Sequence, residues 1–73
     1  MVFEAARQQA MLTLDDLWIR YLGLGGTAIQ SEFKGYVEGT SHPSDHDHDV
    51  LAHALNERFM DMDMDSPVPY SHP

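Results

Sequence analysis

The chain contains no cysteine, few basic residues and no long apolar run. Without cysteine it has neither a disulfide framework nor a thiolate zinc site, which fits a reducing compartment and makes the cytoplasm the expected location. No apolar stretch approaches the roughly 20 residues that a membrane-spanning helix needs, and the first residues lack a basic end followed by an apolar run. We therefore expect neither export nor membrane insertion.

Basic side chains are scarce: four Lys and Arg stand against twelve Asp and Glu, and the formal net charge is −8. The acidic residues concentrate after Gly39, where the sequence has seven Asp or Glu and a single basic residue, Arg58. Because neutralisation of phosphates by basic side chains dominates nucleic-acid affinity, this balance argues against direct DNA or RNA binding. A basic protein partner is the more natural expectation, although solubility alone also explains the acidity.

A chain of 73 residues is long enough for one domain, whose stability margin is thin, roughly 3–5 kcal/mol. No nucleophile, base and orienting group converge in the sequence, so we predict that the protein is not an enzyme. The glycines at 23, 25 and 26 lack the lysine and preceding strand of a phosphate loop. No cofactor is expected.

Apolar periodicity predicts an all-α fold, a three-helix domain that spans residues 13–62. In the first helix the Thr13 hydroxyl caps the free amides, and the glycine pair Gly25 and Gly26 ends the helix near Leu24. Residues 1–12 contain good helix formers but little apolar bulk. We interpret them as a flexible or frayed helical segment.

Two further helices are expected after the glycine pair. Thr27 and Gln30 form a candidate capping box, which predicts a second helix that ends at Gly39. Ser44 caps the third helix, which should fray at its acidic C-terminal end. Residues 63–73 are acidic and rich in proline, and we predict that they are disordered.

The predicted core consists of the large apolar side chains on the inner faces of the three helices. They are Leu14, Leu17, Trp18, Tyr21, Leu22, Ile29, Phe33, Val37, Leu51, Leu55 and Phe59. Trp18→Ala is expected to be among the costliest substitutions, on the order of 3–5 kcal/mol for a fully buried side chain. Gly35 lies within the second helix at a cost of about 1 kcal/mol, which indicates a close backbone approach there.

One face of the third helix combines imidazoles with carboxylates. The side chains that share this face, at spacings of three and four residues, are His46, Asp49, His53 and Glu57. Such ligands suit zinc or nickel, so a metal-binding protein is our alternative hypothesis. The spacing matches no specific metal motif, and the face points toward water, so a solvated polar face is the simpler interpretation.

Residues 60–65 alternate methionine with aspartate. Three thioethers are soft ligands of the kind that copper(I) prefers. Adaptable apolar surface combined with charge is the simpler interpretation.

These features favour a small acidic protein-interaction module, with a regulatory role, that binds either a basic protein or a second copy of itself as a homodimer. The side chains expected to contact the partner are Ile19, Asp45, Asp49, Glu57, Met60, Met62 and Tyr70. Association with a basic partner should weaken as salt rises, whereas a self-dimer sealed by Ile19 should be nearly insensitive to salt.

Two stretches resemble short bacterial three-helix proteins to which no activity is attached. One is the LGLGGTA turn at residues 22–28, and the other is the HDVLAHALNERF helix at residues 48–59. The proline-rich ending at residues 67–70 adds to the similarity, which would cover most of residues 12–71. The resemblance implies a natural single-domain unit and carries over no functional residue.

Overall fold

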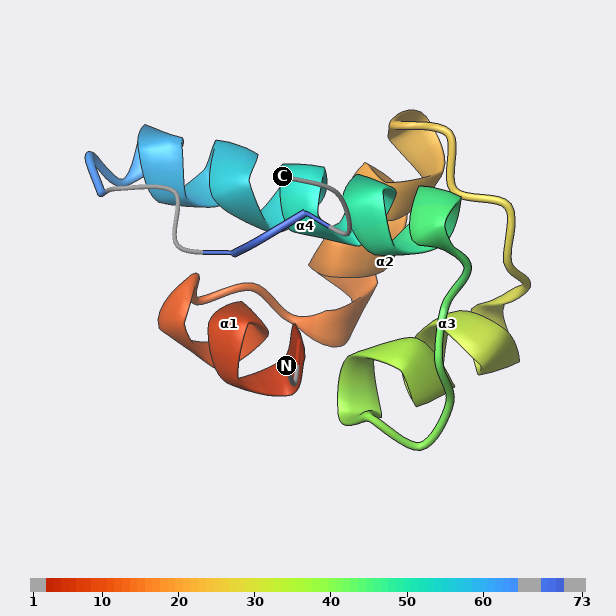
Figure 1. Ribbon diagram of the computed structural model, residues 1–73. Helices are drawn as coiled ribbons and strands as arrows, with labels where there is room; N and C mark the ends of the chain where they lie inside the picture. Colours follow the sequence, from red (N-terminus) through yellow and green to blue (C-terminus); the bar gives the residue numbers. More distant parts are fainter. Residues whose placement is uncertain (1–2, 65–67, 71–73) are drawn as a thin grey trace.

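The computed structural model describes residues 3–64 and 68–70, and these contain four helices and no strand (Figure 1). The helices are α1 (Phe3–Gln9), α2 (Leu14–Gly23), α3 (Gln30–Glu38) and α4 (Asp45–Asp61). The predicted all-α fold is confirmed. The predicted count of three helices is wrong, because the N-terminal segment forms a helix of its own.

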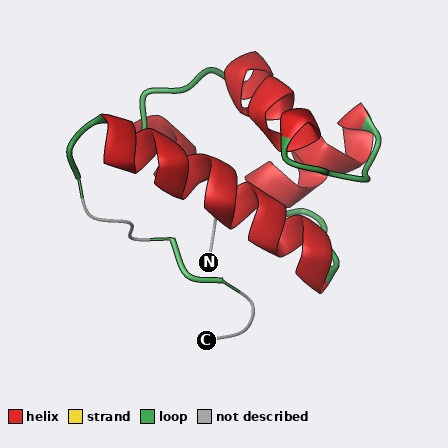
Figure 2. Ribbon diagram, turned by 90° about the horizontal axis from the view of Figure 1, so that it is seen from above, coloured by secondary structure: helices red, strands yellow, loops and turns green. Residues whose placement is uncertain are grey.

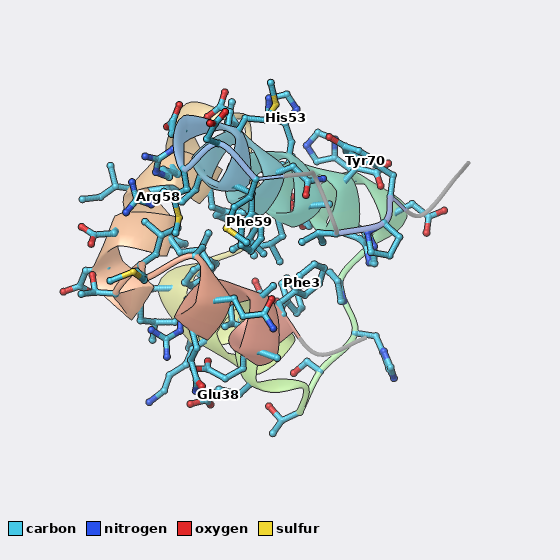
Figure 3. The ribbon with its side chains drawn as sticks, turned by 90° about the vertical axis from the view of Figure 1, so that its left-hand side faces the viewer. Phe3, Glu38, His53, Arg58, Phe59 and Tyr70 are labelled. Atoms are coloured by element: carbon cyan, nitrogen blue, oxygen red, sulfur yellow. The ribbon has the colours of Figure 1, made fainter. Side chains whose placement is uncertain are left out.

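The longest helix, α4, organises the molecule. It lies above α1 in the view of Figure 1 and packs against both α1 and α2, while α3 packs against α1 and α2. Phe3 from α1 and Phe59 from α4 both point into the space between their helices (Figure 3). Both side chains are buried, so α1 completes one wall of the core.

The segment expected to fray is packed from residue 3 onward, and residues 1–2 lie outside the described part. Phe3 and Ala6 are buried on α1, and Ala10 and Leu12 are buried in the turn that follows. Arg7 pairs with Glu4 and donates a hydrogen bond of 2.7 Å to the Leu12 carbonyl oxygen. Burial of one face therefore stabilises a seven-residue helix that propensity alone would leave marginal.

Two predicted caps are confirmed. The Asp16 amide donates to the Thr13 hydroxyl oxygen at 3.0 Å at the start of α2. The Asp47 amide donates to the Ser44 hydroxyl oxygen at 3.2 Å at the start of α4. Each cap satisfies an amide that the first helical turn leaves without a partner.

The predicted start of the second helix is wrong by two residues, because the residue before the helix is Ile29 and not Thr27. α3 begins at Gln30, and the Ile29 amide just before it donates to Glu32 Oε1 at 3.1 Å. Thr27 makes no capping box with Gln30, because its hydroxyl donates instead to the carboxylate of Asp47 on α4. A tertiary contact has replaced the local one.

The α3 glycines explain how the helix ends. Gly39 has a φ of 85°, the left-handed cap that the sequence predicts. At Gly35 the close neighbour is the loop that follows α3, since a Cβ there would lie 2.6 Å from the Ser41 hydroxyl oxygen. The Thr40 and Ser41 amides both donate to the Gly35 carbonyl oxygen, which draws this loop over the glycine.

Most of the predicted core is confirmed. The predicted side chains that are fully buried are Leu17, Tyr21, Phe33, Val37, Leu51, Leu55 and Phe59. Leu14 and Trp18 are only partly buried. The predicted burial of Leu22 and Ile29 is wrong, since these side chains are 46% and 64% exposed. Leu22 lies beside the Leu17 and Tyr21 stripe of α2, and Ile29 precedes α3.

The described part of the C-terminal segment is ordered against α4, contrary to the predicted disorder of residues 63–73. We call residues 68–70 the strap; residues 65–67 and 71–73 lie outside the described residues. The strap runs alongside α4 in two perpendicular views (Figures 1 and 2). Val68 is 3% exposed and joins the core cluster. A buried valine and paired backbone therefore hold a stretch that its composition alone would leave extended in solvent.

Candidate interaction surface

A buried carboxylate fixes the α2–α3 loop against α4. Asp47 is 4% exposed, and its Oδ1 accepts hydrogen bonds from the Tyr21 hydroxyl at 2.9 Å and from the Thr27 amide at 3.0 Å. The Thr27 hydroxyl donates to Oδ2 at 3.0 Å, and the Ser44 hydroxyl lies 3.3 Å from the same oxygen. Burial alone would raise the pKa of Asp47, but the hydrogen bonds from Thr27, Tyr21 and Ser44 outweigh it and hold that pKa below its ordinary value.

Tyr21 is the second member of this network. Its hydroxyl oxygen accepts a hydrogen bond of 2.8 Å from the Ala28 amide, and burial raises the pKa of Tyr21 to about 12. Its ring packs against Trp18 and Phe33 at centroid distances of 5.7 and 5.1 Å. A Cβ at Gly26 would overlap the Tyr21 ring, so the loop can close over the tyrosine only with glycine at that position.

Two arginines join α4 to the N-terminal half of the chain. Arg20 on α2 lies 3.7 Å from Glu57 and 3.8 Å from Asp61. Arg58 donates a hydrogen bond of 3.0 Å from Nε to the Ala10 carbonyl oxygen. Surface ion pairs of this kind contribute about 0–1 kcal/mol, so they orient the side chains more than they stabilise the fold.

These arginines border a hollow of about 360 Å³ that we call the Met11/Ile19 surface. It is lined by Met11, Leu12, Asp16, Ile19, Arg20 and Arg58. Met11 is 75% exposed, the largest fraction among the large apolar side chains of the described residues, and Ile19 is 67% exposed, as is Met60. Met11 also has a φ of 57°, in the left-handed region that few residues with a long side chain adopt.

The structure separates the predicted partner-binding residues into two groups. Ile19 lies on the Met11/Ile19 surface, and Glu57 lies 3.7 Å from Arg20, which lines the same surface. Asp49 and Tyr70 line another hollow, of about 420 Å³, beside the strap. In Figure 3, Arg58 and Tyr70 lie on opposite sides of α4.

The remaining predicted partner residues line neither hollow. Asp45 is exposed at the first position of α4. Met60 is exposed near the other end of the helix, and Met62 is half-buried just after it. The seven predicted residues therefore do not form one continuous site.

The alternative metal site is only partly assembled. His46, Asp49 and His53 line the 420 Å³ hollow together. His46 Nε2 lies 2.8 Å from the Gly25 carbonyl oxygen, and His53 Nε2 lies 3.4 Å from Glu57. Within residues 3–64 and 68–70 no group of three or more His, Asp or Glu side chains is placed to hold a metal ion. The metal hypothesis gains no support from this geometry.

Sequence reasoning missed three residues that the structure makes important. Asp47, Met11 and Asn56 belong to neither the predicted core nor the predicted sites. Asp47 pairs with Thr27 across 20 positions, so local sequence pattern gave no signal for this contact. The left-handed backbone at Met11 and the strap contacts of Asn56 leave no pattern in the sequence.

Comparison of the chain with protein-family models, with curated proteins and with solved structures finds no match. Each helix in the described part of the chain is too short or too polar to traverse a lipid bilayer.

Proposed function

We propose that this protein is a small acidic interaction module that binds a basic, partly apolar segment of another protein at the Met11/Ile19 surface. The proposal rests on the backbone conformation and the exposure of Met11. It combines a left-handed backbone with a side chain that is 75% exposed. Such a conformation costs of order 1–3 kcal/mol, and outliers of this kind cluster at functional sites. An exposed methionine is also an adaptable contact for a partner.

The surroundings of this surface favour positive charge on the partner. Arg20 already faces Glu57 and Asp61, and Arg58 already donates to a backbone carbonyl. Asp16 lies in the hollow itself. The formal net charge of −8 acts in the same direction. A second copy docked by the same face would instead bring like charges together, so we propose a basic partner, with a regulatory role in the cytoplasm.

The test is a titration with a synthetic amphipathic peptide that carries leucines at i and i+4 and lysines elsewhere. The lysine peptide should bind, its affinity should fall as salt rises, and a peptide with glutamates in place of the lysines should not bind. Ile19→Ser should weaken binding at least about tenfold, the effect of losing roughly one buried aliphatic contact. Fluorescence anisotropy of the labelled peptide measures each case.

Ile29→Ser is the matched control, since Ile29 is 64% exposed and lies outside the hollow. It should leave peptide affinity unchanged. Equal losses in Ile19→Ser and Ile29→Ser, or equal binding of both peptides, would refute the proposed site. Capture from a native cell extract by wild type and by Ile19→Ser, at low and high salt, then separates partners that need this surface from those that do not.

A further inference from the structure

The strap is held by contacts that recognise an extended backbone. Asn56 Nδ2 donates to the Val68 carbonyl oxygen at 2.8 Å, and the Val68 amide donates to Asn56 Oδ1 at 3.0 Å. One side-chain amide thus satisfies both backbone groups of a single residue. A ring nitrogen of His48 lies 3.1 Å from the Pro69 carbonyl oxygen. Helix α4 therefore binds residues 68–70 as it would bind a separate extended peptide.

The Val68 side chain adds an apolar anchor to this pairing. It is 3% exposed and belongs to the same buried cluster as Phe3 and Phe59. Phe3 also packs edge-on against His48 at a centroid distance of 5.0 Å. We call the surface of α4 that holds the strap through Asn56 and His48 the strap groove. It takes one buried aliphatic side chain, while Pro69 and Tyr70 stay exposed, and nothing in these contacts requires the strap to come from the same chain.

The turn that follows α4 directly is strained at Asp63. Asp63 has a φ of 63°, and the turn is closed by hydrogen bonds from the Asp63 amide to the Met60 carbonyl oxygen and from the Met64 amide to the Phe59 carbonyl oxygen. A residue other than glycine in this region stores strain that an opened chain would release. Short strained hinges next to an exchangeable terminal segment favour exchange between copies.

We propose that the strap exchanges between two copies of this chain, so that residues 68–70 of one copy occupy the strap groove of the other. The second copy supplies a segment that fits the groove by identity, and opening of its Asp63 turn relieves strain. Residues 66–73 contain no Lys, Arg, Asp or Glu, so the exchanged contact itself is insensitive to salt. Two chains of formal charge −8 repel each other, so salt should promote the dimer. Salt should therefore strengthen this dimer, whereas it should weaken the binding of a basic partner at the Met11/Ile19 surface.

The first test changes only the hinge of the full-length chain. Asp63→Pro forbids the left-handed conformation and should shift the protein from monomer to dimer, as measured by light scattering over a concentration series. Asp63→Gly removes the strain and should weaken dimer formation about fivefold relative to wild type, as expected for a compatible glycine at a left-handed position. Far-ultraviolet circular dichroism checks that all variants keep their helices.

The second test asks whether the dimer uses the strap. In the Asp63→Pro chain, Val68→Asp should destroy the anchor and Asn56→Ala should damage the groove, so each double variant should be monomeric. An equimolar mixture of the two double variants should associate, because an intact strap then meets an intact groove on another copy. Gln30→Ala, which truncates an exposed amide on α3, is the control and should leave dimerisation unchanged.

If Asp63→Pro fails to fold, Asp63→Val replaces it, since a β-branched residue is also disfavoured at positive φ. The proposal is overturned if the folded hinge variant stays monomeric at millimolar concentration. It is equally overturned if a dimer persists in both double variants, or if their mixture fails to associate. Binding of an added peptide of residues 66–73 by a chain that stays monomeric would assign the groove to a partner's segment instead.

Discussion

The Tyr21 hydroxyl donates a hydrogen bond of 2.9 Å to Asp47, a residue that lies 26 positions later in the chain. The same hydroxyl oxygen accepts a hydrogen bond from the Ala28 amide. One phenol thereby connects α2, the α2–α3 loop and the first turn of α4. All of these groups are buried or half-buried, so loss of any member leaves a polar atom without its partner.

Tyr21→Phe should therefore destabilise the protein by about 1–3 kcal/mol although the aromatic ring is kept. The expected loss comes from one donor fewer on Asp47 and an unpaired Ala28 amide. Urea denaturation followed by circular dichroism measures it. Tyr36→Phe, which removes a hydroxyl from a half-buried tyrosine on α3, is the matched control and should have a smaller effect.

Stability should fall in acid partly through Asp47. Because hydrogen bonds hold the folded-state pKa of Asp47 below its ordinary value of 3.8, its contribution is present above that value and is lost as the pH falls through the lower folded pKa. The free energy of unfolding, measured by urea denaturation between pH 6 and pH 2, should thus decline more steeply in wild type than in Asp47→Asn. Parallel curves for the two proteins would contradict this assignment.

The loss of stability at alkaline pH should depend partly on Tyr21. Its pKa is raised from 10.0 to about 12 in the folded protein, so the unfolded chain ionises first as the pH rises. The stabilisation is complete below the ordinary pKa and disappears as the pH approaches about 12. Tyr21→Phe should remove this part of the pH dependence, while Tyr36→Phe should retain it. Phenolate absorbance and urea denaturation measure ionisation and stability on the same samples.

Met11→Gly should raise the free energy of unfolding by about 1 kcal/mol, because glycine adopts the left-handed conformation without strain. Met11→Ala removes the same exposed side chain but keeps the strained backbone, so it should bring no such gain. Thermal denaturation of wild type, Met11→Gly and Met11→Ala measures these differences in stability. A stabilised Met11→Gly that binds the lysine peptide more weakly would show that the methionine is kept at the expense of stability.

Among the aromatic side chains, Phe33→Ala should cost more than Trp18→Ala. Phe33 is 1% exposed, and its loss should cost about 3–5 kcal/mol, enough to unfold so small a domain. Trp18 packs against Tyr21 and Phe33 but is only partly buried, so its truncation should cost less, about 2 kcal/mol. Circular dichroism melting curves rank the two variants. The reverse order would place the tryptophan deeper in the core.

Some features could be predicted because their causes lie within a few residues. The caps at Thr13 and Ser44 depend on a hydroxyl and an amide three positions later, and Gly39 depends on its own freedom at positive φ. The exposure of Ile19 followed from its position beside the apolar stripe of α2. Part of the candidate site was therefore visible in the sequence.

Tertiary structure alone decided the rest. The N-terminal segment becomes α1 because Phe3 finds a buried site against α4, and the strap is ordered because Asn56 pairs with Val68. The Thr27 hydroxyl turns from its expected local cap to a carboxylate 20 residues away. Local pattern determines where helices begin and end through short-range hydrogen bonds. Burial and pairing over long sequence distances determine which segments pack, and no periodicity encodes them.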